Sequence, residues 1–376
     1  MGERTAGDTM ANNEHNDSAV TPHRSISKNG TMHSIQLLRA VAALLVVLYH
    51  GQQAISARFA SPAFPAESYL FAFGAVGVHI FFVISGFIMV YTTRLDQKFI
   101  ARDFLRKRVL RIYPMYWVCA TFYLVIHYML GSPYLLEGSE IWGALALAPE
   151  YASAIIGPAW TLSFEMFFYI CFGIAMKLGP TRGLITLGLA FTLSIATGFL
   201  LPADGAFGRL VTNSLLLEFI AGTAIGWLLA TGRLPQRGGP MIVVFGLVLF
   251  AAGIAAGYDR LPSVIIWGIP STLLVAGAVI WENANGFKKA LRKFSHFGNS
   301  SYVLYLIHLV IITLTIALAA EVPLIRKLEP AVAAFVIAGL SLLAAEGLHA
   351  GIERPMTRSL NGLFRARAPK EKLARF

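Results

Sequence analysis

The stretch LRAVAALLVVLYH, residues 38–50, is apolar along almost its whole length, yet it carries an arginine near its start and a histidine at its end. Residues 36–55 around it reach the length of about 20 apolar residues that a membrane-spanning helix needs. Arg39 and His50 are eleven residues apart. On a helix they would be separated by about 16 Å along the axis and lie within about 20° of one face. A snorkelling arginine and an interfacial histidine are the structural alternatives to a functional pair.

The rest of the chain is similarly apolar. Of its 376 residues, 56% are hydrophobic and 14% are charged, with a mean hydropathy of +0.63. This composition is typical of an all-α, multi-pass membrane protein rather than a large soluble enzyme. About ten spans are predicted, near residues 36–55, 74–93, 112–130, 159–177, 183–201, 210–230, 240–257, 262–281, 300–320 and 330–352. The apolar segment 141–149 is too short to cross and is predicted to be interfacial or re-entrant.

The net charge of +11 comes mainly from a few loops. Lysines and arginines are concentrated after the second, eighth and tenth predicted spans, whereas residues 131–158 contain three glutamates and no Lys or Arg. Basic loops stay preferentially in the cytoplasm. Both termini are therefore predicted to be cytoplasmic, as an even number of spans requires, and the charge does not indicate a nucleic-acid partner.

The chain divides into three predicted segments. Residues 1–33 are polar and without pattern, which predicts a disordered cytoplasmic tail. Residues 34–356 form the membrane region, and residues 357–376 form a basic cytoplasmic tail. Cys119 and Cys171 both lie inside apolar runs and form no CxxC motif, so we expect neither a disulfide framework nor a metal site.

The segment KFIARDFLRKRVLRIYP, residues 98–114, places apolar side chains roughly along one helical face and cations on the other. This pattern predicts a basic amphipathic helix at the inner membrane surface. Such a helix can be a topological anchor or a surface that binds a polyphosphate, and the sequence leaves both interpretations open.

Glu165 is predicted to lie in the fourth span, about 9 Å below its outer end by helical rise. His50 is expected at a similar depth. Ionisable groups inside a membrane usually mark a functional site. An imidazole and a carboxylate at matched depth can act as a general base and its orienting partner, while cytoplasmic arginines hold a phosphorylated donor. The same groups would also suit an ion-coupled transporter, and Glu165 could instead form a structural ion pair.

Other spans also carry polar residues with open roles. The sequence around Ser85 contains no GxSxG motif, which favours a packing role for this serine over nucleophilic catalysis. His308 lies within the ninth span, where packing and functional roles are equally compatible with the pattern. Glycines 74, 77 and 86 of the second span indicate close helix approach or a broken helix. Structural roles are predicted at the inner end of the last span for Glu346, His349 and Glu353.

These segments together resemble the acyltransferase-3 family of integral membrane acyltransferases, which includes exopolysaccharide, O-antigen and nodulation-factor O-acetylases. The similarity covers about residues 34–356 and rests on motifs in the same order. These are LRAVAALLVVLYH, GVHIFFVISGFIM, FLRKRVLRIYPMYW, PAWTLSFEMFFY, SYVLYLIHL and IERP. Thr161 stands where the family motif has a serine, which is a mild departure. His79 is not matched to a catalytic position.

The resemblance implies ten core helices in a bacterial inner membrane, with acetyl-CoA as the acyl donor. The implied acceptor is a lipid-linked or exported carbohydrate, and no metal is required. Carried over by motif, the catalytic residues are His50, Arg39 and Glu165, with His50 as the base. The implied donor-binding residues are Arg108, Arg111 and Arg39. We assign acceptor binding to His308, Ser85 and Trp160. A saccharide transporter or flippase and a non-catalytic assembly partner are the competing hypotheses.

Overall fold

The computed structural model describes residues 31–59, 71–93, 99–132, 135–201, 203–257, 261–322 and 328–366. Every regular element among them is a helix. The residues from His33 onward form one unit. The predicted tail 1–33 lies outside the described residues up to residue 30, and His33 already belongs to the first helix. Of the predicted tail 357–376, residues 357–366 are helical and the remainder lies outside the described residues.

Ten helical segments of the described residues are long and apolar enough to cross a membrane, which confirms the predicted number. They are α1 (His33–Phe59), η1 (Ala72–Ala75) with α2 (Val76–Thr93), α3 (Ala101–Met129), η2 (Gly157–Ala159) with α5 (Trp160–Ala175) and η3 (Met176–Leu178), α6 (Pro180–Leu200), α7 (Gly205–Val211) with α8 (Leu216–Ala230), α9 (Gly239–Ala256), η4 (Val264–Gly268) with α10 (Ile269–Asn285), α12 (Ser301–Glu321), and α14 (Pro330–Leu348) with η6 (His349–Glu353) and α15 (Arg354–Ala366). Shorter elements are α4 (Gly138–Leu145), α11 (Lys289–Ser295) and η5 (His296–Gly298).

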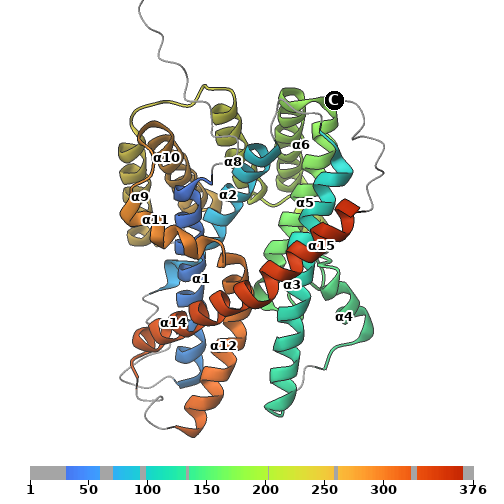
Figure 1. The fold of residues 1–376 in the computed structure, drawn as a ribbon, viewed down its shortest axis with the longest axis vertical. Coiled ribbons are helices and arrows are strands. Elements are labelled where there is room, and N and C mark those ends of the chain that lie inside the picture. The colour runs from blue at the N-terminus through green and yellow to red at the C-terminus, as the bar shows by residue number, and fades with distance from the viewer. Residues whose placement is uncertain are drawn as a thin grey trace, which may run out of the picture. The chain divides into compact units, whose positions relative to one another are not determined.

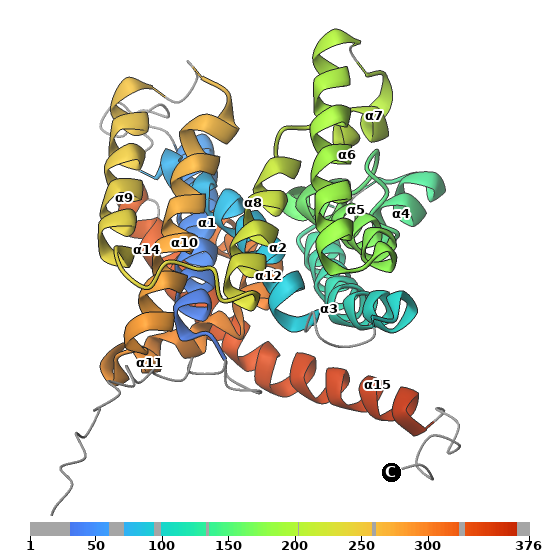
Figure 2. The same cartoon turned by 90° about the horizontal axis from the view of Figure 1, so that it is seen from above.

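Helix α1 lies at the centre of this unit. It packs against α2, α12, α14 and α10, and its first residues contact α11. Helices α9 and α10 lie on one side of α1, and α3, α5 and α6 lie on the other (Figure 1 and Figure 2). We call the end of the unit that carries α11 and the start of α3 the basic end. A functional group on α1 can therefore face side chains from both halves of the molecule.

The closest helix approach is between α2 and α8. A Cβ atom on Gly86 would lie 2.0 Å from the carbonyl oxygen of Phe219, and one on Gly222 would lie 1.9 Å from that of Val83. Glycine is required at both positions because any side chain would overlap the opposing backbone. Gly74 and Gly77 bring the second span almost as close to α1, with a Cβ atom 2.3 Å from the carbonyl oxygen of Leu45 and 2.2 Å from that of Ala42. The close approach predicted for this span is confirmed.

The start of α1 is held by a carboxylate from another span. Both oxygens of Glu282, on α10, accept hydrogen bonds from the first backbone N–H groups of α1, at 2.9 Å from His33 and 2.6 Å from Ser34. These N–H groups have no partner within the helix, and the helix dipole favours a negative charge beside them. Glu282 therefore fixes the basic end of the helix that carries Arg39 and His50.

Replacing Glu282 with glutamine should lower the stability of the folded protein by about 1–2 kcal/mol. The amide keeps one acceptor oxygen but loses the charge and turns an NH₂ group toward the helix start. Thermal unfolding of the purified protein in detergent measures the effect. Glu321→Gln is the matched control because Glu321 is exposed at the end of α12. An equal melting temperature for both variants would contradict this role.

The basic segment 98–114 does not form a separate surface helix. Lys98 lies outside the described residues, and residues 101–129 form one uninterrupted helix, α3, with Pro114 inside it. The segment is instead the first part of the helix that forms the third span, with Phe104 and Ile112 buried and Arg102, Lys107 and Arg111 exposed. Arg108 contacts Thr92 and Tyr169. Helix α15 is also amphipathic: Met356, Leu360 and Leu363 share one side, opposite Arg354 and Arg358. It runs along one edge of the unit (Figure 2).

The end of α4 and the segment after it pack against α3, an arrangement compatible with the re-entrant alternative predicted for residues 141–149. Three aromatic side chains near the middle of α3 donate hydrogen bonds to the last carbonyl groups of α4 and to the residue that follows. The bonds are Tyr113 to Ala146 at 2.9 Å, Tyr116 to Ala144 at 2.9 Å and Trp117 to Leu145 at 3.0 Å. The carbonyl of Leu147 then accepts from Ser163 at 2.8 Å. Such non-helical backbone is tolerated at membrane depth because protein surrounds it.

Candidate active site

Arg39 lies on α1 toward the basic end and is almost completely buried, with 8% of its surface exposed. Its guanidinium donates a hydrogen bond to the side-chain oxygen of Gln36 at 3.3 Å. Four groups from three other elements lie within its electrostatic range, namely Arg111, Glu165, Tyr169 and Glu353. Residues that are far apart in the sequence therefore converge on Arg39.

Arg108 and Arg111 lie one turn apart on α3. Arg108 donates to the hydroxyl of Thr92 at 3.1 Å, and its guanidinium lies over the ring of Tyr169 at 5.7 Å. The Nε atom of Arg108 is buried without a hydrogen-bond partner. The side chain of Arg111 is exposed and forms no hydrogen bond or ion pair with another described residue. We call Arg39, Arg108 and Arg111 the arginine cluster, and part of its donor capacity is free to bind an anion.

Glu165 is the carboxylate of this cluster. It accepts hydrogen bonds from the hydroxyl of Ser85 on α2, at 3.0 Å, and from that of Tyr169 one turn along its own helix. The prediction that Glu165 lies at the depth of His50 was wrong. Helix α5 begins only after the re-entrant segment, well inside the unit, so counting from an outer boundary placed Glu165 too far from the basic end.

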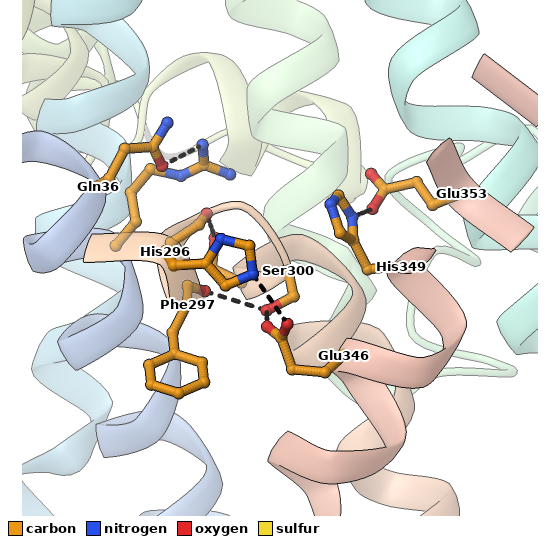
Figure 3. A network of polar contacts seen from close by, with 10 residues as sticks. Gln36, His296, Phe297, Ser300, Glu346, His349 and Glu353 are labelled. Atoms are coloured by element: carbon orange, nitrogen blue, oxygen red, sulfur yellow. Dashed lines mark hydrogen bonds and ion pairs between the residues drawn. The ribbon is translucent and has the colours of Figure 1, made fainter. Parts of the chain in front are cut away.

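A second carboxylate approaches the arginine cluster from η6. Glu353 is 9% exposed, and its carboxylate accepts from His349 at 2.5 Å. Figure 3 shows this pair beside a separate contact set in which Glu346 meets Ser300 and His296. The latter set ties α14 to the start of α12, in keeping with a structural role. Sequence reasoning did not place Glu353 within range of Arg39, because nothing in the IERP motif indicates where η6 packs.

His50 lies farther along α1, away from the basic end. Its Nδ1 atom is 3.1 Å from the backbone carbonyl oxygen of Val46 and 3.2 Å from Nε2 of His308, on α12. The two ring centroids are 5.1 Å apart. His308 is completely buried, whereas His50 is partly exposed. The structure thus pairs His50 with a second imidazole rather than with Glu165.

Two tyrosines of α12 lie between these groups. Tyr302 donates to the backbone carbonyl of Ile112 at 2.8 Å. The hydroxyl of Tyr305 is 2.9 Å from the hydroxyl of Thr161 and 2.9 Å from the carbonyl oxygen of Pro158. Thr161 supplies the hydroxyl that a serine would supply, so the departure from the family motif keeps this contact.

The three residues assigned to acceptor binding each contact different partners. Ser85 is bonded to Glu165, and His308 contacts His50. Trp160 begins α5 with 37% of its surface exposed, and its ring packs edge-on against Phe82 and Phe164. The sequence pattern could not identify these partners, because it placed each residue only by its position within a span.

A further buried pair lies outside this arrangement. His79 of α2 and Glu218 of α8 meet at 2.6 Å, and both are buried. Sequence reasoning did not identify Glu218, since the two residues are 139 positions apart. Among the described residues, no group of three or more His, Cys, Asp or Glu side chains is placed to hold a metal ion.

Comparisons with known proteins add independent findings. The family model described as an acyltransferase domain matches residues 32–346. The exopolysaccharide production protein ExoZ of Rhizobium meliloti (strain 1021) is 30% identical over 302 residues, which is 77% of this chain and 91% of that protein. The acyltransferase MdmB of Streptomyces mycarofaciens is 27% identical over 76% of this chain and 82% of its own length. The O-acetyl transferase of Shigella phage Sf6 is 31% identical over 37% of this chain and 44% of its own. No solved structure matches the chain.

Proposed function

Because the chain belongs to the acyltransferase-3 family, we propose that it transfers an acetyl group from acetyl-CoA to a hydroxyl of a cell-surface or exported carbohydrate. The protein is a multi-pass membrane acyltransferase. The donor, the acceptor and the bacterial inner membrane are the proposed parts. An exopolysaccharide acceptor is supported by similarity to ExoZ, and the basic end is proposed to face the cytoplasm because Lys and Arg favour that side.

The observation that carries this proposal is the separation of two groups along one face of α1. The arginine cluster lies near the basic end, and His50 lies eleven residues beyond Arg39, a rise of about 16 Å. Coenzyme A has a comparable geometry, since an extended phosphopantetheine arm separates its phosphates from its thioester. Phosphates bound by the arginine cluster would leave the thioester within reach of His50.

The proposed reaction follows from this placement. The acceptor hydroxyl gives its proton to the free nitrogen of His50 as its oxygen attacks the thioester carbonyl. The carbon–sulfur bond then breaks, and the departing thiolate of coenzyme A takes the proton from the imidazolium. Arg39 and its neighbours hold the donor phosphates by charge-assisted hydrogen bonds. Glu165 fixes the cluster through Ser85 and Tyr169, and no net proton is consumed.

Reversing the charge of Arg111 tests donor binding. Arg111→Glu should raise KM for acetyl-CoA by about 10-fold or more, because a charge-assisted contact to phosphate is lost and repulsion replaces it. Arg111→Lys keeps the charge and should lie between the variant and wild type. Steady-state kinetics at two salt concentrations measures the effect. An unchanged KM in Arg111→Glu would remove this residue from the donor site.

The activity itself is tested with membranes that contain the protein and radiolabelled acetyl-CoA. The proposal predicts label in the carbohydrate fraction as an ester that mild alkali releases. Membranes from a matched strain without the protein are the control. If carbohydrate crosses the membrane but gains no label, the protein is a transporter or flippase rather than a transferase acting on that carbohydrate.

A further inference from the structure

The contact between His50 and His308 has no role in the proposed reaction as described so far. It joins α1 to α12 across 258 residues of sequence. One ring, His308, is fully buried, and the other is partly exposed. A fully buried imidazole inside a membrane bundle has a desolvation cost, so its position requires an explanation.

The neighbours of His50 determine which of its nitrogens carries the proton. The carbonyl oxygen of Val46, 3.1 Å from Nδ1, can only accept a hydrogen bond. Nδ1 must therefore carry the hydrogen for this contact to be favourable. Nε2 of His308, 3.2 Å from the same atom, is then an acceptor that shares the same N–H group. This arrangement leaves Nε2 of His50 without a proton, so that nitrogen can act as the base.

The same reasoning fixes the tautomer of His308. If Nε2 accepts, the proton of the neutral ring must be on Nδ1, which is buried and has no hydrogen-bond partner among the described residues. Buried surroundings leave His308 no solvent partner that would favour the opposite tautomer. In the alternative, Nε2 of His308 donates and Nδ1 of His50 carries no proton. The lone pairs of Nδ1 and of the Val46 carbonyl oxygen would then face and repel each other.

We propose that His308 is a positioning residue that holds His50 in the tautomer and ring orientation needed for general-base catalysis. This inference rests on the proposed function, and it replaces the assignment of His308 to acceptor binding. When His50 takes the proton from the carbohydrate hydroxyl, the ring becomes positively charged. Its Nδ1–H group, which donates to Val46 and His308, then stabilises that charge. The neutral imidazole of His308 thus orients the catalytic histidine, as the carboxylate of the catalytic triad does in serine hydrolases. It does so without placing a second charge at this depth.

Three substitutions at position 308 test the proposal. His308→Leu removes the nitrogen that accepts the hydrogen bond from His50, and it should lower kcat by about tenfold or more. The KM for acetyl-CoA should be unchanged because the arginine cluster is intact. His308→Gln can place its side-chain oxygen where Nε2 lies and should recover most of the activity. His308→Asn is polar but too short to reach His50, and should resemble the leucine variant. His127→Gln, on α3, is the matched control.

The outcomes separate this proposal from the proposed function. Thermal unfolding of each variant shows whether it is folded, and the glutamine and asparagine pair keeps the test valid if the leucine variant is not. Equal kcat in the glutamine and asparagine variants would overturn the positioning role. A change confined to the KM for the carbohydrate substrate would overturn it as well. In that case wild-type transfer and its loss in His50→Ala would still support the proposed function. Absence of transfer by wild type would overturn the proposed function instead.

Discussion

Replacing His50 with alanine is expected to lower the rate of acetyl transfer by about 10²–10⁴-fold, the contribution of one positioned general base. The reason lies in the site. His50 is partly exposed, its Nδ1 is occupied by Val46 and His308, and it lies eleven residues beyond Arg39 on α1. Removing it leaves the attacking hydroxyl without a proton acceptor. Turnover of acetyl-CoA by purified protein, with the acceptor saturating, measures the loss.

The matched control for His50→Ala is His127→Ala, which removes an imidazole from α3 in the same membrane unit. Both variants should insert and unfold at similar temperatures. Added imidazole should restore part of the activity of His50→Ala, because the substitution opens space at a partly exposed position. Retention of more than about a tenth of the wild-type rate would remove His50 from the proposed mechanism.

The second large effect is expected at the contact between α2 and α8. In Gly222→Val, the new Cβ would lie 1.9 Å from the carbonyl oxygen of Val83 and 2.7 Å from the backbone nitrogen of Phe87. These are backbone atoms and cannot rotate away, so the helices must separate. The loss of stability should exceed the ~4 kcal/mol that marks the most severe single substitutions, and little folded protein should be recovered.

Gly339→Val on α14 is the control for that variant, because a Cβ there meets nothing within 4 Å. Size-exclusion chromatography in detergent and the yield of folded protein measure both variants. Full recovery of folded Gly222→Val would show that α2 and α8 can separate without cost. The close contact could then no longer be regarded as a fixed support for Ser85, which lies on the same helix as Gly86.

The spans and the family were predictable from the sequence, and the re-entrant segment was predictable in part. Long apolar runs determine the ten spans because bilayer thickness sets their length. Exact bounds were less accessible: α3 begins at Ala101 rather than near residue 112. Its first turns carry many charges, so a search for apolar runs does not include them. Helix propensity and packing against α5 nevertheless keep them helical.

The depth of Glu165 was not predictable by counting residues. That procedure assumes that each span begins at a membrane boundary, and α5 does not, because hydrogen bonds from α3 hold the preceding segment deep inside the unit. The error had a consequence for chemistry, since it suggested Glu165 as the orienting partner of His50. The structure places that carboxylate with the arginine cluster.

The contact between His50 and His308 also required the structure. Each histidine was a candidate from its own span, but helical periodicity says nothing about which faces of α1 and α12 meet. The same holds for Glu353, whose approach to Arg39 depends on how η6 packs. Local patterns thus predicted which residues are unusual in a membrane, and tertiary packing determined which of them act together.

The central claim is that a donor held at the basic end is used by a base farther along α1. It is tested most directly by supplying membrane-impermeant, radiolabelled acetyl-CoA to one face of sealed vesicles, inverted in one preparation and right-side-out in the other. The account predicts labelled carbohydrate when acetyl-CoA reaches the face that bears α11 and the start of α3, and none from the opposite face. Equal labelling from both faces, or labelling from the opposite face alone, would contradict it.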